Sequence, residues 1–151
     1  DTREKGASWA MLLKVANSCQ IGHFLEHKIV QLNPNVPEKT TNCSSVAVSF
    51  AVAEKDVERL VQYFVEKVRE GSYSPQTAMI VHQGLHVPAE VEEYGLRAKR
   101  EILTIDIATG VAERNGLRVI EVTGRRGIIG AVAGIGCFDM GLKAAGLPED
   151  F

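Results

Sequence analysis

A polar segment from Leu32 to Asn42 carries residue types that bind phosphate or a phosphate-bound metal. Lys39, Thr40 and Thr41 offer one cation and two hydroxyls, and these groups suit phosphate oxygens or a phosphate-bound metal. Pro34 and Pro37 fix their own φ and favour extended backbone just before them, so the segment should keep one shape. We interpret it as a rigid binding loop between two strands. The alternative is a proline-stiffened connection whose polar groups face only water.

A second candidate is the N-terminal segment, which precedes a helix pattern and reads Asp1-Thr2-Arg3-Glu4-Lys5-Gly6-Ala7-Ser8. Carboxylates and a hydroxyl just ahead of a helix can hold Mg²⁺ and phosphate together, because the helix end favours anions and the carboxylates favour the metal. The competing interpretation is a solvated terminus with a capping residue.

A third candidate runs from Thr123 to Gly130, in the order strand, glycine turn, helix. Its glycines allow backbone N–H groups to approach an anion, and its two arginines supply charge-assisted hydrogen bonds. The pattern matches neither a Walker A loop nor a GxGxxG fingerprint. Gly130, Gly134 and Gly136 are better explained by close packing of the last helix on a sheet.

Alternating helix and strand patterns position these candidates. Apolar residues at helical spacing make 55–70 the most regular predicted helix, and β-branched runs mark the strands. The order predicts a single α/β domain with a mixed sheet and helices packed on it. The strands on either side of the polar loop should be neighbours, because no helix pattern separates them. The expected elements are helix 7–18, strands 24–32 and 45–53, helix 55–70, strand 78–82, helices 88–102 and 105–115, strand 117–122 and helix 128–145.

Composition limits the class of protein. A chain of 151 residues that is 45% hydrophobic and 24% charged fits one globular domain and excludes disordered and fibrous classes. Its net charge of -2 gives no global attraction to nucleic acid, so a polyanionic partner would need a local basic patch. Three scattered cysteines suit a reduced, cytoplasmic protein better than a disulfide framework or a metal knuckle. No apolar run reaches the roughly 20 residues of a membrane helix, and the N-terminus does not resemble a cleavable signal.

Taken in order, the three candidates resemble a known family. They are similar to the ATP-using catalytic region of the archaeal agmatinylcytidine synthetase, which modifies a minor isoleucine tRNA. The similarity lies in Asp1-Thr2, in Asn33-Pro34-Asn35-Val36-Pro37 with Lys39, Thr40 and Asn42 behind it, and in Gly124-Arg125-Arg126-Gly127-Ile128-Ile129-Gly130. The chain also resembles methanogenesis marker protein eleven, through Gly6-Ala7-Ser8-Trp9 and Thr40-Thr41-Asn42-Cys43.

The resemblance implies the ATP-binding domain of a synthetase-, ligase- or kinase-like enzyme, with ATP and Mg²⁺ as cofactors. It implies Mg²⁺ at Asp1 and Glu4, and catalytic roles for Asp1, Ser8 and Lys39. The implied nucleotide contacts come from all three segments: Thr2, Gly6, Asn33, Asn35, Thr40, Asn42, Gly124, Arg125, Gly127 and Gly130.

The chain departs from the family pattern near its start. Arg3 and Glu4 follow Asp1-Thr2 where the synthetase has another aspartate, and Ser8 lies beside the position of an expected threonine. We expect the family's first strand to be missing from this sequence, together with the oligonucleotide-binding barrel and zinc ribbon of the synthetase. Two functions therefore stay open. One is an ATP-dependent enzyme acting on a small-molecule or RNA acceptor, and the other is a non-catalytic nucleotide- or protein-binding domain of a methanogenesis-associated protein.

Overall fold

The computed structural model of this chain describes residues 6–36, 43–144 and 146–147. Strand β1 (His23–Gln31) pairs with β2 (Ser44–Ala51), and β3 (Ala78–Val81) pairs with β4 (Arg118–Glu121). The helices are α1 (Ser8–Ser18), α2 (Val57–Gly71), α3 (Ala89–Ala98), α4 (Ile105–Arg114) and α5 (Ile128–Gly136), with short 3₁₀ turns η1 (Glu54–Asp56) before α2 and η2 (Phe138–Met140) after α5.

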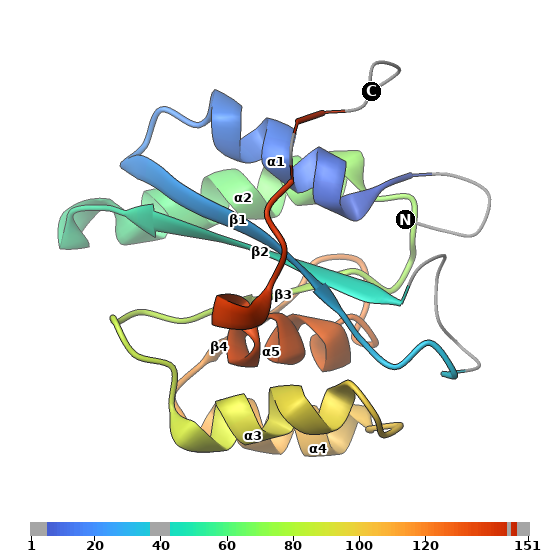
Figure 1. The fold of residues 1–151 in the computed structure, drawn as a ribbon. Coiled ribbons are helices and arrows are strands. Elements are labelled where there is room, and N and C mark those ends of the chain that lie inside the picture. The colour runs from blue at the N-terminus through green and yellow to red at the C-terminus, as the bar shows by residue number, and fades with distance from the viewer. Residues whose placement is uncertain (1–5, 37–42, 145, 148–151) are drawn as a thin grey trace.

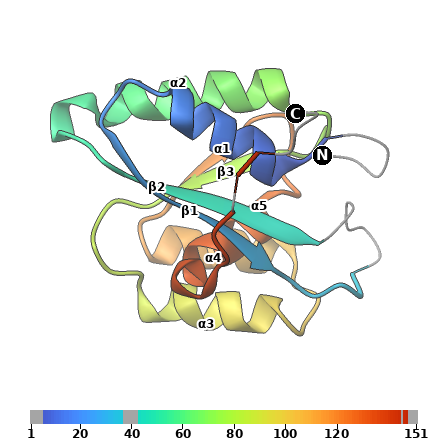
Figure 2. The ribbon, with the colours of Figure 1, turned by 45° about the horizontal axis from the view of Figure 1, so that its top comes forward.

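The elements form layers around the β1–β2 pair (Figure 1). Helices α1 and α2 lie over one face of the pair, α5 lies against the other face, and α3 and α4 pack beyond α5. The view in Figure 2 shows the same separation of the two helical layers. Within the described ranges, the structure contains no helix with both the length and the hydropathy needed to cross a membrane.

The predicted pairing of the two strands around the polar loop is confirmed. β1 and β2 run antiparallel, with Lys28 opposite Ala47 and Gln31 opposite Ser44. An irregularity between Phe24 and Glu26 shifts the register, and the side chain of Leu25 at that point is exposed. The bulge therefore interrupts the in-and-out alternation of side chains at the start of β1.

The α/β class is confirmed, but the sheets are antiparallel where a mixed sheet was expected. Both pairs among the described residues, β1 with β2 and β3 with β4, are antiparallel. The difference has a topological reason. A single crossover helix makes consecutive strands parallel, whereas two helices, α3 and α4, connect β3 to β4 and return the chain in the opposite direction.

The last helix was predicted over 128–145, and this was wrong at its C-terminal end. α5 ends at Gly136, and after η2 the chain turns toward the edge of β1. There Ile29 and Leu142 exchange both backbone hydrogen bonds, each at 2.8 Å. Tertiary pairing with β1 thus replaces the continuation of a helix that already contains Gly130, Gly134 and Gly136, and glycine is a poor helix former.

Two hydrophobic clusters fill the layers. The larger joins α3, α4 and α5 to the ends of β1 and β4, and its Ile128, Val91 and Val132 are fully buried. The smaller lies between α1, α2 and the β1–β2 pair, around Ala16, Leu60 and Phe64.

Candidate functional site

Three described element ends that adjoin the predicted site segments lie on one edge of the molecule (Figures 1 and 2). The N-terminal end of α1, the C-terminal end of β1 and the connection from β4 to α5 all face this edge. A Cβ built on Gly130, near the start of α5, would lie 3.6 Å from Leu32 Cδ1 at the end of β1. The structure therefore brings the last helix to the beginning of the polar loop.

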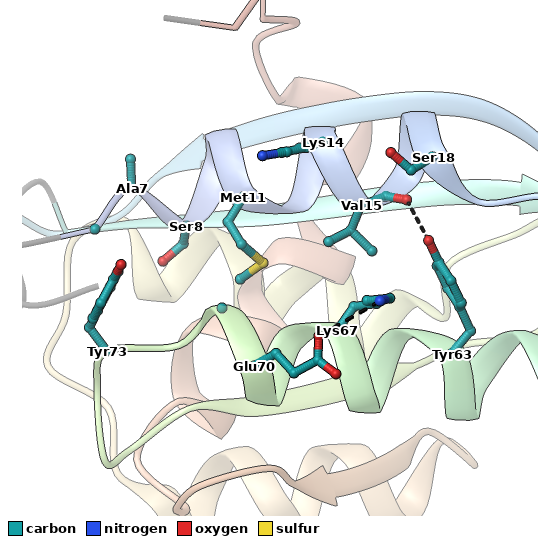
Figure 3. A pocket seen from close by; sticks show the side chains of 12 residues that line it. Ala7, Ser8, Met11, Lys14, Val15, Ser18, Tyr63, Lys67, Glu70 and Tyr73 are labelled. Atoms are coloured by element: carbon teal, nitrogen blue, oxygen red, sulfur yellow. Dashed lines mark hydrogen bonds and ion pairs between the residues drawn. The ribbon is translucent and has the colours of Figure 1, made fainter. Parts of the chain in front are cut away.

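A cleft of about 450 Å³ lies between α1 and α2 (Figure 3). Gly6 and Ser8, two of the predicted site residues, line one end of it beside Tyr73. Met11 and Val15 line its α1 side, while Lys67, Glu70 and Tyr63 line its α2 side.

α1 starts at this cleft with a helix end suited to an anion. Its N-cap position is Ala7, which makes no side-chain cap, and its first turn contains no acidic residue. The positive end of the helix dipole is therefore not offset by a carboxylate within that turn. Gly6 has a φ of 94°, a conformation that glycine adopts without strain.

His27 of β1 fixes the position of α1. Its Nε2 lies 2.9 Å from the backbone oxygen of Trp9, so Nε2 donates and the ring is in the Nε2–H tautomer. The His27 side chain is buried, and this burial lowers its pKa below the ordinary value although the hydrogen bond to Trp9 opposes the shift. The bond anchors the first turns of α1 on the strand that leads to Asn33.

Asn33 begins the polar loop and is held firmly. Its Oδ1 accepts a hydrogen bond from Asn35 N at 3.0 Å, and its own N–H donates to the oxygen of Ala98 at 3.1 Å. Cys43 closes the far side of the loop, where its Sγ donates to the oxygen of Asn33 at 2.8 Å. Asn33 is buried and builds the loop by an Asx turn, whereas Asn35 is exposed.

The glycines of the β4–α5 turn serve backbone packing. A Cβ on Gly124 would overlap the oxygen of Pro75, and one on Gly127 would lie 2.7 Å from Ala78 N. The N–H groups of residues 122, 123 and 124 all donate to the oxygen of Thr77, and that of Gly127 donates to Gln76 at 2.8 Å. Because these N–H groups already donate to protein oxygens, a ligand at this turn would be bound mainly by side chains.

Arg125 of the turn lies on the surface. Its Nε is 2.8 Å from Glu121 Oε1, and both side chains are about half exposed. Because an exposed ion pair contributes little free energy, Arg125 can exchange this partner for a phosphate.

The predicted residues thus fall into three groups and a remainder. Gly6 and Ser8 lie at the α1–α2 cleft. At the end of β1, Asn33 contacts Asn35, and Gly130 at the start of α5 lies beside the neighbouring Leu32. Gly124 and Gly127 lie against the 75–78 segment, and Arg125 pairs with Glu121. The others lie outside the described residues: Asp1, Thr2, Glu4, Lys39, Thr40 and Asn42.

Sequence reasoning missed the other residues that line the cleft, among them Lys14, Lys67 and Tyr73. Lys99 belongs to a basic cluster with Arg97 and Arg100 that could meet a polyanion or simply be solvated, and its Nζ donates to the oxygen of Gln31 at 3.2 Å. The helical spacing of Lys14 and Lys67 places them on outer faces, but spacing alone does not show that those faces border a cleft. In the part of the chain that the structure describes, no three His, Cys, Asp or Glu side chains gather to hold a metal ion.

Comparison with known sequences shows relatives along most of the chain. The family model described as the TiaS TCKD domain matches residues 1–57. An uncharacterized protein of Methanocaldococcus jannaschii is 38% identical over 99% of this chain and 51% of its own length. The isoleucine-tRNA 2-agmatinylcytidine synthetase TiaS of Pyrococcus horikoshii is 33% identical over 72% of this chain and 26% of its own length. The chain therefore spans about half the length of the first relative and about a quarter of the second.

The fold is shared with solved structures. The crystal structure of a complex of TiaS with its isoleucine tRNA and ATP matches with a TM-score of 0.78 over 90% of this chain and 34% of that chain, at 22% identity. A tRNA fluorescent labeling enzyme matches with a TM-score of 0.71 over 83% of this chain and 31% of its own, at 24% identity. The likeness to methanogenesis marker protein eleven stays a prediction. The matched segment, the synthetase relatives and the shared fold place this chain in the tRNA 2-agmatinylcytidine synthetase superfamily.

Proposed function

We propose that this chain is an ATP-binding domain of an ATP-dependent synthetase-, ligase- or kinase-like enzyme. The observation that carries the proposal is the position of α1, whose N-terminus has no side-chain cap, opens at the α1–α2 cleft and faces the same edge as the C-terminal end of β1 and the start of α5. A helix N-terminus is suited to phosphate. This shared edge supports a single phosphate site for the segments that the resemblance pairs around ATP.

Each segment has its own part in this proposal. Ser8 and Gly6 meet a phosphate at the start of α1, Lys39 and Thr40 meet another from the polar loop, and Arg125 approaches from the turn before α5. Asn33 contributes by shaping the loop, because its Oδ1 already accepts the hydrogen bond of Asn35. The exposed Asn35 is then the better candidate for direct contact.

Mg²⁺ belongs to the same proposal through the residue types at the N-terminus. Asp1 and Glu4 would hold it, since carboxylate oxygens are ligands that Mg²⁺ prefers. Bound there, the ion would supply positive charge to the phosphate oxygens. Both residues lie outside the described ranges, so the support for this site is chemical type and position ahead of α1.

We propose an RNA acceptor and a cytoplasmic location. Relatives named as tRNA 2-agmatinylcytidine synthetases support the acceptor, and three cysteines without a disulfide suit a reducing compartment. Basic residues lie on the last turn of α3 and just after it, where Lys99 contacts the end of β1. They provide the local basic patch that a chain of net charge -2 requires.

The alternative is a non-catalytic nucleotide- or protein-binding domain. The β4–α5 turn favours it, because the N–H groups of Gly124 and Gly127 donate to protein oxygens and do not face a ligand. Release of AMP or ADP from ATP separates an enzyme from this alternative.

Calorimetric titration with ATP and Mg²⁺ tests the proposal. Lys39→Ala should weaken binding by about 1.5 to 3 kcal/mol, the range for hydrogen bonds to charged groups. The matched control is Lys55→Ala, an exposed lysine in η1 at the far end of α2 from the cleft. A wild-type chain that binds no ATP would refute the proposal, and equal effects of the two variants would remove Lys39 from the site.

A further inference from the structure

We infer that the α1–α2 cleft holds the base and ribose of the nucleotide whose phosphates lie at the start of α1. This inference rests on the proposed function and adds which part of the ligand the cleft recognises. It assigns a binding role to Met11, Lys67 and Glu70, none of which belongs to the predicted phosphate-binding segments.

The size of the cleft fits a nucleoside. From Tyr63 to Gly71, the α2 wall extends over eight residues, which is about 12 Å at 1.5 Å per residue. Its volume of about 450 Å³ lies in the range of small-molecule pockets. A phosphate chain needs neither this depth nor an apolar floor.

The floor of the cleft is apolar and shaped by a glycine. Met11 and Val15 of α1 form it, and Tyr63 closes one end, where its hydroxyl donates to the oxygen of Val15 at 3.4 Å. A Cβ on Gly71 would lie 2.8 Å from Met11 Cγ, so the glycine leaves room for Met11 between the helices. Thioether and aliphatic side chains of this kind pack well against the face of a planar base.

The polar residues at the rim of the cleft determine which end of the nucleotide lies near Ser8. Lys67 and Glu70 form an exposed ion pair at 3.7 Å on α2. Glu70 repels phosphate but accepts hydrogen bonds from ribose hydroxyls, while Lys67 donates to ring nitrogens. Ser8 lies at the end of the cleft away from Tyr63, beside the helix N-terminus (Figure 3). The phosphate chain therefore extends out of the cleft at Ser8, which follows in sequence the segment with the proposed Mg²⁺ ligands.

The test compares ATP with inorganic tripolyphosphate, each with Mg²⁺, by calorimetry. Gly71→Leu displaces Met11 from the floor of the cleft and should weaken ATP binding about tenfold, equivalent to 1.4 kcal/mol, while leaving tripolyphosphate affinity unchanged. The control is Leu85→Ala, which truncates a 98% exposed side chain outside the cleft. Unchanged ATP affinity in Gly71→Leu, or an equal loss for both ligands, would overturn the inference. A wild-type chain that binds neither ligand would instead overturn the proposed function.

A second variant keeps the inference testable if Gly71→Leu does not fold. Glu70→Gln preserves the length of an exposed side chain but removes the carboxylate charge. It should reduce the preference for ATP over 2′-deoxy-ATP to less than half of the wild-type ratio. An unchanged ratio would contradict the placement of the ribose beside Glu70.

Discussion

The two helical layers of this domain are packed very differently. Between α3 and α5, a Cβ on Gly136 would overlap the backbone oxygen of Val91, so the two backbones touch. Between α1 and α2, a cleft of about 450 Å³ remains open. The α3–α5 layer therefore acts as the scaffold that fixes the strand ends, whereas the α1–α2 layer retains the space in which a ligand fits.

The largest effect is expected where the backbones touch. Gly136→Ala places a methyl group against the α3 backbone, which cannot yield as a flexible side chain does, and should lower the free energy of unfolding by about 3 kcal/mol. Gly130→Ala, in the same helix, meets only Leu32 Cδ1 at 3.6 Å and Ser45 Cβ at 3.9 Å. This control should be neutral or stabilising by up to about 1 kcal/mol. Urea unfolding followed by circular dichroism measures both, and a harmless Gly136→Ala would contradict the close packing.

Alkaline pH should weaken the scaffold layer through Tyr94. The Tyr94 hydroxyl donates to the oxygen of Ile129 at 2.9 Å, and burial raises its pKa well above the ordinary value of 10.0. Above about pH 10 the unfolded chain loses this proton and the folded chain keeps it, so stability falls as pH rises. Tyr94→Phe should cost about 1 kcal/mol at pH 8. It should also show a smaller decline between pH 9 and 11 in urea unfolding, and equal slopes for both proteins would count against the prediction.

Acidic pH should lower the stability of the α1–α2 layer, through His27. The lowered pKa means that the folded chain keeps His27 neutral while the unfolded chain binds a proton below about pH 6.5. The contribution to stability is present above pH 6.5 and declines as pH falls toward the folded pKa. Trp9 is the only tryptophan and lies on α1, so its fluorescence reports the contact.

His27→Gln, which does not titrate, is the matched variant. Its unfolding midpoint should change less than that of the wild type between pH 7 and 5. If the two proteins respond alike, His27 does not anchor α1 in the manner described.

The smallest effect is expected from the ion pair that joins the layers. Arg118 of β4 contacts both oxygens of Glu58 on α2, and these hydrogen bonds, followed by one from Gln62, lower the Glu58 pKa to about 2. The contribution is present above pH 4.5 and is lost as pH falls toward 2. Glu58→Gln should differ from the wild type only slightly at pH 6, because the pair is exposed. Its thermal midpoint should converge with that of the wild type near pH 2, and a difference that persists there would exclude the carboxylate as its cause.

The positions of Gly6 and Ser8 could be predicted because they depend on local geometry. Gly6 and Ser8 lie at the start of a helix pattern, and that is sufficient to place them at its positive end. The neighbouring strands around the polar loop followed from a short interval without a helix pattern, and their pairing is confirmed. In contrast, Lys67 and Glu70 occupy ordinary exposed helix positions, and spacing does not show whether such a position faces open water or a cleft.

The sequence alone determined those elements whose formation depends on neighbours along the chain. α2 is the clearest case, because its apolar residues recur at helical spacing and form the buried face that the structure shows. Only the tertiary structure decided that α5 stops at Gly136, that β3 and β4 run antiparallel, and that Gly124 and Gly127 serve packing. Each of these outcomes depends on contacts between segments far apart in the chain. A local sequence pattern does not specify which distant backbone, strand edge or cleft a residue will contact.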